Sequence, residues 1–155
     1  MSEQITSLRE DPGAWDARLT HAYAAREIAE IPFTQLAAWA TSKQLTGWTS
    51  IRLVVAHPSG AWAGGQLLMQ SLPGPLGRLA YAPRAPLVVA QRPEIAAVLR
   101  AELLTALRSL RADGVTLVRL EPGDSVLMDP EGSVVQPDVA LTASLRTPGH
   151  AERGG

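Results

Sequence analysis

The chain contains no cysteine, carries almost no net charge and has no long apolar run, and each of these absences excludes a class of function. Without cysteine there is no disulfide bond, no cysteine-ligated zinc and no thiol catalysis, although this alone does not establish a reducing compartment. The 14 basic and 15 acidic residues give a formal net charge of −1, so no field of the whole protein attracts nucleic acid or an anionic membrane. A nucleic-acid partner would need to be held by a local patch or by a missing segment.

No stretch approaches the roughly 20 apolar residues of a membrane span, and residues 1–10 are polar and lack the apolar core of a signal peptide. We therefore expect a cytoplasmic protein that is not an integral membrane protein. With 155 residues, 46% of them hydrophobic, the chain can bury one core but is too short for two ordinary domains. The expected organisation is a flexible N-terminus at 1–10, a single domain at 11–146 and a flexible polar tail at 147–155.

Two helices are predicted in the first third of the chain. An Asp-Pro pair at residues 11–12 is typical of a helix start, because Asp can cap free amides and proline is tolerated in the first turn. A second helix is expected from about residue 34 to residue 45. Gln35, Trp39 and Lys43 lie four residues apart within it, so all three are expected to project from one helical face.

A meander of three strands is predicted next. Alternating apolar residues indicate strands around 51–55 and 67–69, and a turn at 58–60 connects them. A segment rich in proline and glycine then precedes a third strand at about 78–82. Gly64 and Gly65 lie in the second strand and imply a bulge or a close backbone approach, either to a ligand or to the neighbouring helix. Of these two, we expect close packing on the helix.

The best-defined predicted element is a long helix over residues 93–113, where apolar side chains recur at helical spacing and Gly114 follows as a C-terminal cap. Residues 115–120 are predicted to return into the sheet as a strand, and a last strand is expected near 139–145. Helices packed on a mixed sheet give an α+β layered fold.

Two patches carry more polar and aromatic residues than such a core requires. Their residues are Gln35, Trp39, Lys43, Gly47 and Trp48 in the first, and Gly64, Gly65, Gln66, Tyr81, Pro83, Arg84 and Pro86 in the second. The Lys43 ammonium could contact phosphates, and Arg84, between two prolines, could fork onto a phosphate or a carboxylate. The alternatives are a solvated lysine near a helix end and a rigid turn whose arginine faces water. Trp48 is expected in the core, and Trp39 is left open between core and cleft.

In order and spacing, the two patches resemble the first half of the Fem-type (FemABX) aminoacyl-tRNA-dependent peptidyltransferases. That family pattern reads loosely Q-x-x-x-W-x-x-x-K-x-x-x-G-W, then G-G/A-Q, then Y-x-P-R/K-G-P, and only Ala85 departs from it. The likeness extends from about Trp15 to Leu145 and includes Arg119-Leu-Glu-Pro122. It implies a GNAT-like (acyl-CoA N-acyltransferase-like) mixed sheet flanked by helices, as a first domain without the family's second domain.

The resemblance implies transfer of an amino acid from aminoacyl-tRNA, the co-substrate, to the stem peptide of a peptidoglycan precursor, with no other cofactor. The precursor is a UDP-linked or lipid-linked muramyl pentapeptide, so the protein could act at the inner face of the membrane. In the family, the second domain and a helical arm serve the tRNA. The resemblance implies the substrate-binding residues Lys43, Arg84, Trp39, Tyr81 and Gln35, with Lys43 and Arg84 as anion contacts.

No catalytic residue is predicted. Many family members have an acidic residue a few positions beyond the second proline, whereas this chain continues with apolar residues at 87–90. A non-catalytic precursor-binding module that lacks or needs a separate second domain is therefore an alternative. Exposed apolar surface where that domain would dock could also drive formation of a homodimer.

The sequence gives less support to acetyl-CoA binding and to metal binding. An acetyl-CoA site needs a glycine-containing loop before a helix, but there is no glycine between Gln91 and Leu104. His21, His57 and His150 lack a metal-ligand spacing, and the acidic residues at 124–131 lack the EF-hand pattern. No metal is predicted.

Overall fold

The computed structural model of this protein describes residues 4–122, 127–128 and 134–135. By its internal contacts the chain divides into two units, residues 1–123 and 124–155, and this boundary lies inside the range 11–146 predicted as one domain. In the second unit, β7 (Leu127–Met128) pairs antiparallel with β8 (Val134–Val135). The strand predicted near 139–145 and the tail at 147–155 lie outside the described residues.

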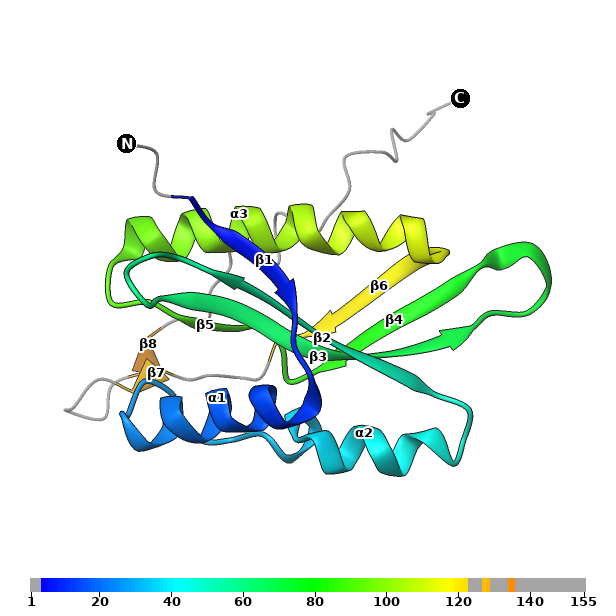
Figure 1. The fold of residues 1–155 in the computed structure, drawn as a ribbon, viewed down its shortest axis with the longest axis horizontal. Coiled ribbons are helices and arrows are strands. Elements are labelled where there is room, and N and C mark those ends of the chain that lie inside the picture. The colour runs from blue at the N-terminus through cyan, green and yellow to red at the C-terminus, as the bar shows by residue number, and fades with distance from the viewer. Residues whose placement is uncertain (1–3, 123–126, 129–133, 136–155) are drawn as a thin grey trace. The chain divides into compact units, whose positions relative to one another are not determined.

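The first unit is built on a six-stranded mixed sheet (Figure 1). Its strands are β1 (Thr6–Arg9), β2 (Thr49–Ala56), β3 (Trp62–Ser71), β4 (Arg78–Pro83), β5 (Leu87–Val89) and β6 (Val115–Glu121). Along the path β1-β2-β3-β4-β6 all pairs are antiparallel except β4 with β6, and β5 pairs antiparallel with β3. The predicted meander and the returning strand are confirmed.

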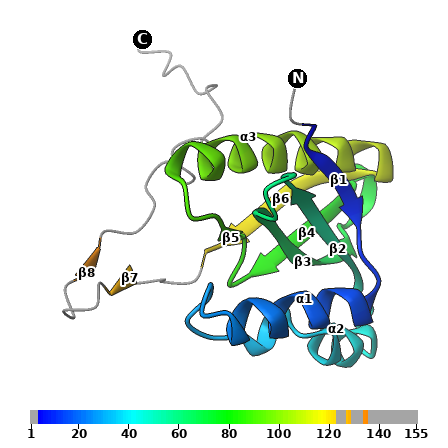
Figure 2. The same cartoon turned by 60° about the vertical axis from the view of Figure 1, so that its left-hand side comes forward.

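Helices cover both faces of this sheet. α1 (Pro12–Ala24) and α2 (Ala37–Gln44) lie on one face and α3 (Pro93–Ser109) on the other, as both views show (Figures 1 and 2). Short 3₁₀ segments complete the unit: η1 (Phe33–Gln35), η2 (Gly74–Leu76) and η3 (Leu110–Asp113). The predicted α+β fold, a mixed sheet flanked by helices, is confirmed.

The N-terminus differs from the prediction. Residues 6–9 form β1 and pair with β2 from Thr6 opposite Ala56 to Arg9 opposite Leu53, where a flexible segment was expected. Ile5 and Leu8 are half-buried and pack against the two cores, which explains why this short segment is held against the sheet. Its only signal in the sequence is a few residues long, too short to be recognised by alternation.

The second predicted helix is also interrupted. Phe33–Gln35 form the 3₁₀ segment η1, Leu36 is extended at φ −73° and ψ 144°, and α2 begins only at Ala37. The prediction that Gln35 shares a helical face with Trp39 and Lys43 is therefore wrong, since the extended residue turns Gln35 away from the helix that carries the other two. By contrast α1 begins as predicted, because the Asp11 carboxylate accepts a hydrogen bond of 2.9 Å from the Ala14 N–H.

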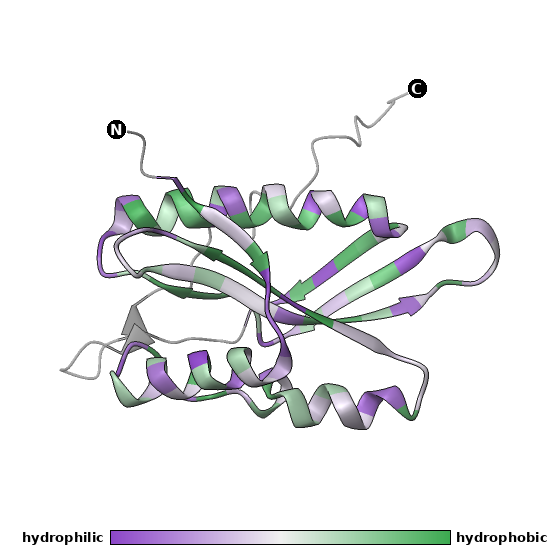
Figure 3. Ribbon diagram, in the orientation of Figure 1, coloured by the Kyte–Doolittle hydropathy of each residue, from purple (hydrophilic) through white to green (hydrophobic). Residues whose placement is uncertain are grey.

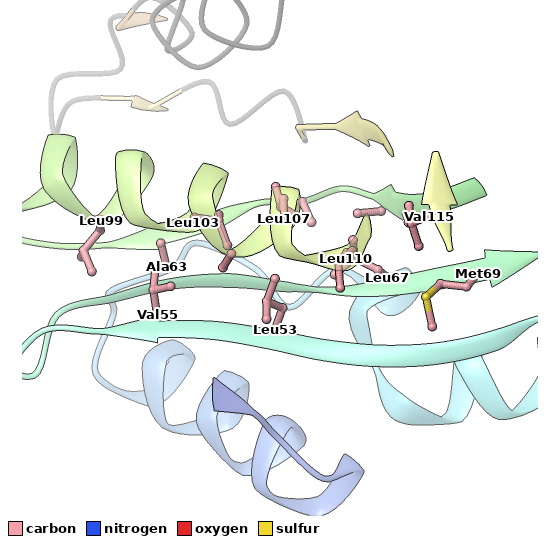
Figure 4. Close-up of a cluster of buried hydrophobic side chains, with 14 residues drawn as sticks. Leu53, Val55, Ala63, Leu67, Met69, Leu99, Leu103, Leu107, Leu110 and Val115 are labelled. Carbon is pink, nitrogen blue, oxygen red and sulfur yellow. The ribbon is translucent and has the colours of Figure 1, made fainter. Parts of the chain in front are cut away.

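The larger core lies between α3 and the sheet (Figure 4). Figure 3 shows hydrophobic residues alternating with hydrophilic ones along α3, as expected for a helix with one buried face. That face and the sheet contribute Leu53, Val55, Leu67, Met69, Leu99, Leu103, Leu107 and Leu110. A smaller core under α1 contains Trp15 and Trp62, whose rings meet edge to face with centroids 5.9 Å apart.

Candidate functional site

A bulge interrupts the strand that runs from β4 into β5. Leu68 of β3 lies opposite Tyr81, but four residues earlier in β3 Gly64 lies opposite Leu87. Residues 65–67 of β3, three in all, therefore face five residues, 82–86, on the other side. Two extra residues bend the chain and re-aim a side chain, as bulges in antiparallel pairs do. The redirected residue is Arg84, which has φ +56°, in the left-handed region.

Both flanks of this bulge are fixed by hydrogen bonds. The Ala85 N–H donates to the carbonyl oxygen of Glu121 at 3.1 Å. The carbonyl oxygen of Pro83 accepts from the Gln35 amide nitrogen Nε2 at 2.7 Å. The Arg84 guanidinium extends outward from this fixed backbone, is exposed, and forms an ion pair with the Glu30 carboxylate.

Gln35 is fully buried, and its side-chain amide joins the separated motifs of the sequence. Its Oε1 accepts from the Gln66 N–H at 2.7 Å, while its Nε2 donates to the Pro83 carbonyl and, at 3.2 Å, to the carbonyl of Gln66. The Trp15 indole N–H in turn donates to the Gln35 carbonyl at 2.6 Å. Gln35 was predicted to bind substrate, but in this structure its amide is enclosed and fully engaged, so it positions the site from inside.

A second buried glutamine extends the same network. Gln66 donates from Nε2 to the Leu36 carbonyl at 2.9 Å and accepts at Oε1 from Arg52 Nε at 3.0 Å. Arg52 is itself buried, and desolvation lowers its pKa, an effect that the nearby Asp16 and Asp11 carboxylates oppose. Sequence reasoning missed Arg52, although an arginine in the middle of an apolar strand was a usable signal.

The two strand glycines allow close packing beneath the bulge, although their close neighbours are strand β2 and Ala85 and not the helix that was expected. A Cβ on Gly65 would lie 2.8 Å from the Cβ of Ala85, and one on Gly64 would collide with the backbone of Leu53. The cavity left there measures only about 10 Å³. It is lined by Gly64, Gly65, Leu67, Ala82, Ala85, Pro86, Leu103, Leu107 and Leu120. A ligand larger than a water molecule does not fit into this cavity.

An aromatic and cationic cluster lies on η1 and α2. The Lys43 ammonium sits 4.4 Å from the centroid of the Trp39 ring, a cation–π contact, so the predicted pairing of these two residues on one helical face is seen. Phe33 meets Trp39 edge to face at 5.3 Å and is 66% exposed. Trp39 Nε1 is buried and has no hydrogen-bond partner within the described part of the chain. Trp48, predicted in the core, is only half-buried.

Tyr81 joins a third group of polar side chains, at the ends of β4 and β6. Its hydroxyl donates to Glu121 Oε2 at 2.6 Å, and Arg119 lies 2.5 Å from the other carboxylate oxygen of Glu121 and 5.5 Å from the Tyr81 ring centroid. The hydrogen bond from Tyr81 lowers the pKa of Glu121, and the same bond raises the pKa of Tyr81. Sequence reasoning did not single out Glu121. Its signal was its position, two residues after Arg119 on a strand beside that of Tyr81.

Three further observations concern the start of α3, possible metal ligands and possible membrane spans. α3 begins at Pro93 with no glycine in its first turn, and the preceding Arg92 forms an ion pair of 3.1 Å with Glu94. Within the described residues no group of acidic, histidine or cysteine side chains could hold a metal ion. In the same part of the chain, no helix combines the length and apolarity needed to cross a bilayer.

No protein-family model matches the chain, and no curated protein matches it in sequence. Solved structures do match. A crystal structure of a probable acetyltransferase has a TM-score of 0.52 at 10% identity, covering 97% of this chain and 94% of that one. An acetyltransferase of Trypanosoma brucei gives 0.47 at 16% identity over 87% of this chain and 96% of its own. An aminoglycoside acetyltransferase from an uncultured soil metagenomic sample gives 0.44 at 17% over 98% and 97%.

At these identities the likeness concerns the fold alone. The probable acetyltransferase with the TM-score of 0.52 shares the fold of this chain, a mixed sheet between two helical layers, in agreement with the predicted GNAT-like fold class. The names of the matched proteins do not specify a donor or an acceptor for this chain.

Proposed function

We propose that this chain is a Fem-like aminoacyltransferase domain that binds a peptidoglycan precursor, a UDP-linked or lipid-linked muramyl pentapeptide. The reaction would be attack by a stem-peptide amine on the ester of aminoacyl-tRNA, which forms an amide and releases the tRNA. The tRNA would be held largely by a second domain, and the reaction would take place in the cytoplasm.

The observation that supports this proposal is the convergence of three motifs. The first of these motifs contains Gln35, the second Gly65-Gln66 and the third Pro83-Arg84. Although Gln35 and Pro83 are 48 positions apart, the buried Gln35 amide bonds to Gln66 and to Pro83. A family pattern whose members were scattered through the fold would have argued against the resemblance. Here its two glutamines and the Pro83 carbonyl form one junction, and its cationic residues Lys43 and Arg84 lie outside that junction.

Lys43 and Arg84 suit the anionic parts of the precursor. Arg84 offers a planar fork for a carboxylate or a phosphoryl group, and Lys43 offers a compact charge on the aromatic wall of Trp39. Both side chains reach solvent. Tyr81 would form a second wall, with the ionised Glu121 beside it.

Binding without transfer is the second candidate. The acidic residue expected beyond Pro86 is replaced by the apolar strand β5, which is engaged in pairing with β3. The cavity beneath the bulge is too small to hold an acyl group. These observations favour a precursor-binding module that does not itself carry out transfer.

Acetyl transfer from acetyl-CoA has weaker support, although the fold is that of acetyltransferases. A pyrophosphate is usually held by free amides at the glycine-rich start of a helix. At the start of α3 there is a proline in place of a glycine, and Arg92 and Glu94 pair with each other.

Calorimetric titration with UDP-linked muramyl pentapeptide tests the proposal. We expect saturable binding that weakens about 5- to 50-fold in Lys43→Ala and in Arg84→Ala, since a charge-assisted contact is lost in each. Arg108→Ala is the matched control, because Arg108 is exposed on α3, across the sheet. Unchanged binding in both folded variants, or saturable binding of acetyl-CoA in place of the precursor, would contradict the proposal.

A transfer assay with aminoacyl-tRNA then separates the two candidates. Product formed by the chain alone supports the enzyme. Precursor binding without product supports the binding module.

A further inference from the structure

Arg84, which the proposed function assigns to an anionic part of the precursor, is already paired with an anion from its own chain. Its guanidinium is paired with the carboxylate of Glu30, which lies 54 residues earlier. Arg84 and Glu30 are 47% and 63% exposed, so the pair lies at the surface, where a ligand from solution can reach it. A carboxylate at this place shows what chemistry the guanidinium accepts.

The backbone is fixed at both Arg84 and Glu30. Arg84 is held on its two sides by the Pro83–Gln35 and Ala85–Glu121 hydrogen bonds. On the other side, the loop after α1 is closed by the Glu27 N–H, which donates to the Ala22 carbonyl at 2.9 Å. Ile28 and Ile31, which flank Glu30, pack against the core beneath α1.

The fixed backbones at Arg84 and Glu30 reduce the ordering that this surface ion pair requires. An exposed pair is usually weak because two long side chains must be ordered at once. Here the backbones are already in place, so less ordering is needed, and the pair remains weak enough for a ligand to displace it. Such a contact competes with an incoming anion and does not block the site.

We infer that Glu30 is a built-in competitor for the anion site of Arg84, and that a carboxylate or phosphoryl group of the ligand must displace it. The identity of that ligand rests on the proposed function. The apparent dissociation constant equals the intrinsic constant divided by the fraction of the protein that is able to bind. Glu30 would therefore reduce affinity and select for ligands that carry more negative charge than a single carboxylate.

The test is a cycle of charge-removing substitutions, titrated with UDP-linked muramyl pentapeptide. Glu30→Gln is expected to tighten binding about 3- to 10-fold, because the competing charge is gone. In an Arg84→Gln background the same substitution should have no effect. Glu27→Gln, which removes the same charge from the same loop, is the matched control and should leave the affinity unchanged.

Two results of this cycle would overturn the inference. One is unchanged affinity in Glu30→Gln. The other is tightening that persists when Arg84 is already replaced, or that Glu27→Gln reproduces, since either would indicate a general effect of charge.

A ligand-independent measurement distinguishes failure of the inference from failure of the proposed function. The Arg84 Nε–H resonance should shift in Glu30→Gln but not in Glu27→Gln, and inorganic diphosphate should move it at lower concentration in Glu30→Gln than in the wild type. If both responses occur while no variant binds the precursor, the proposed function fails and the competition stands. If the Arg84 Nε–H resonance changes neither on the Glu30→Gln substitution nor on addition of diphosphate, the inferred competition by Glu30 is wrong for any ligand.

Discussion

The buried glutamine junction and two residues of the charged rim outside it, Lys43 and Arg84, belong to the same sequence pattern, but the junction and the rim differ in exposure and in bonding. We define the junction as Gln35, Gln66 and the Pro83 carbonyl, and the rim as Glu30, Lys43 and Arg84. In the junction both glutamines are 0% exposed and their amides are bonded to protein. In the rim the ion pair is about half exposed and the lysine rests on an indole ring.

This difference separates the residues that build the site from the residues that would contact a ligand. A buried amide that lost its partners would remain unsatisfied, so the junction is sensitive to any change. Side chains of the rim can exchange one partner for another, including water. A pattern of residues shared with a family therefore does not identify contact residues by itself, because some of its members build the site from within.

The largest effect is expected at the junction. Gln35→Leu leaves the Gln66 N–H and the Pro83 carbonyl without their partner, and should lower the free energy of unfolding by roughly 2–5 kcal/mol. Urea denaturation measures this change. Gln44→Leu is the control, since Gln44 is exposed on α2, and should change stability by less than about 0.5 kcal/mol. Equal stability of the two variants would show that the junction does not hold the fold.

A smaller effect is expected where the bulge packs on β3. Gly65→Ala places a Cβ 2.8 Å from that of Ala85 and should lower the free energy of unfolding by about 1–3 kcal/mol. Adding Ala85→Gly removes the opposing Cβ and should restore part of the loss, which a double-mutant cycle measures. Gly64→Ala offers the contrast, because its new Cβ would meet backbone that no such substitution removes. If Ala85→Gly restores none of the free energy of unfolding lost in Gly65→Ala, the contact with the Ala85 Cβ is not what requires a glycine at position 65.

The smallest effect concerns ionisation at the end of β6. Tyr81→Phe removes the hydrogen bond that most lowers the pKa of Glu121, so this pKa should rise toward its ordinary value. Because the folded-state pKa is lowered, ionised Glu121 stabilises the fold above its unfolded pKa, and that contribution is lost as the pH falls through the folded pKa. Carboxyl NMR titration follows the change, and Tyr23→Phe, an exposed tyrosine, is the control. An unchanged Glu121 titration would show that the hydrogen bond is absent in solution.

The sequence predicted the elements whose signals are local. The signals for the Asp11 cap, for strands β2 and β3 and for the apolar face of α3 each lie within a few turns or one strand, and these elements were found where expected. The two strands do not show the expected alternation, since β3 is buried on both faces from Trp62 to Met69. Strand β1 was missed because it is short and depends on pairing with β2, more than 40 residues away.

The site was predicted less completely, since its geometry depends on distant partners. Gln35 could not be recognised as buried from its neighbours, because its bonds go to residues 31 and 48 positions away. The bulge at Arg84 is visible only when the registers of β4 and β5 against β3 are compared. Trp39 and Lys43 share a helical turn, and their pairing followed from spacing alone.

The central claim is that the two patches of the sequence, one with Trp39 and Lys43 and the other with Arg84, form one binding site. Its most direct test is an NMR titration of isotope-labelled protein with UDP-linked muramyl pentapeptide. The account predicts that the Trp39 indole N–H, the Lys43 amide and the Arg84 Nε–H shift together, with one dissociation constant, while the β2–β3 turn at residues 58–60 stays unchanged. Shifts at only one of the two patches, or constants that differ between them, would contradict it.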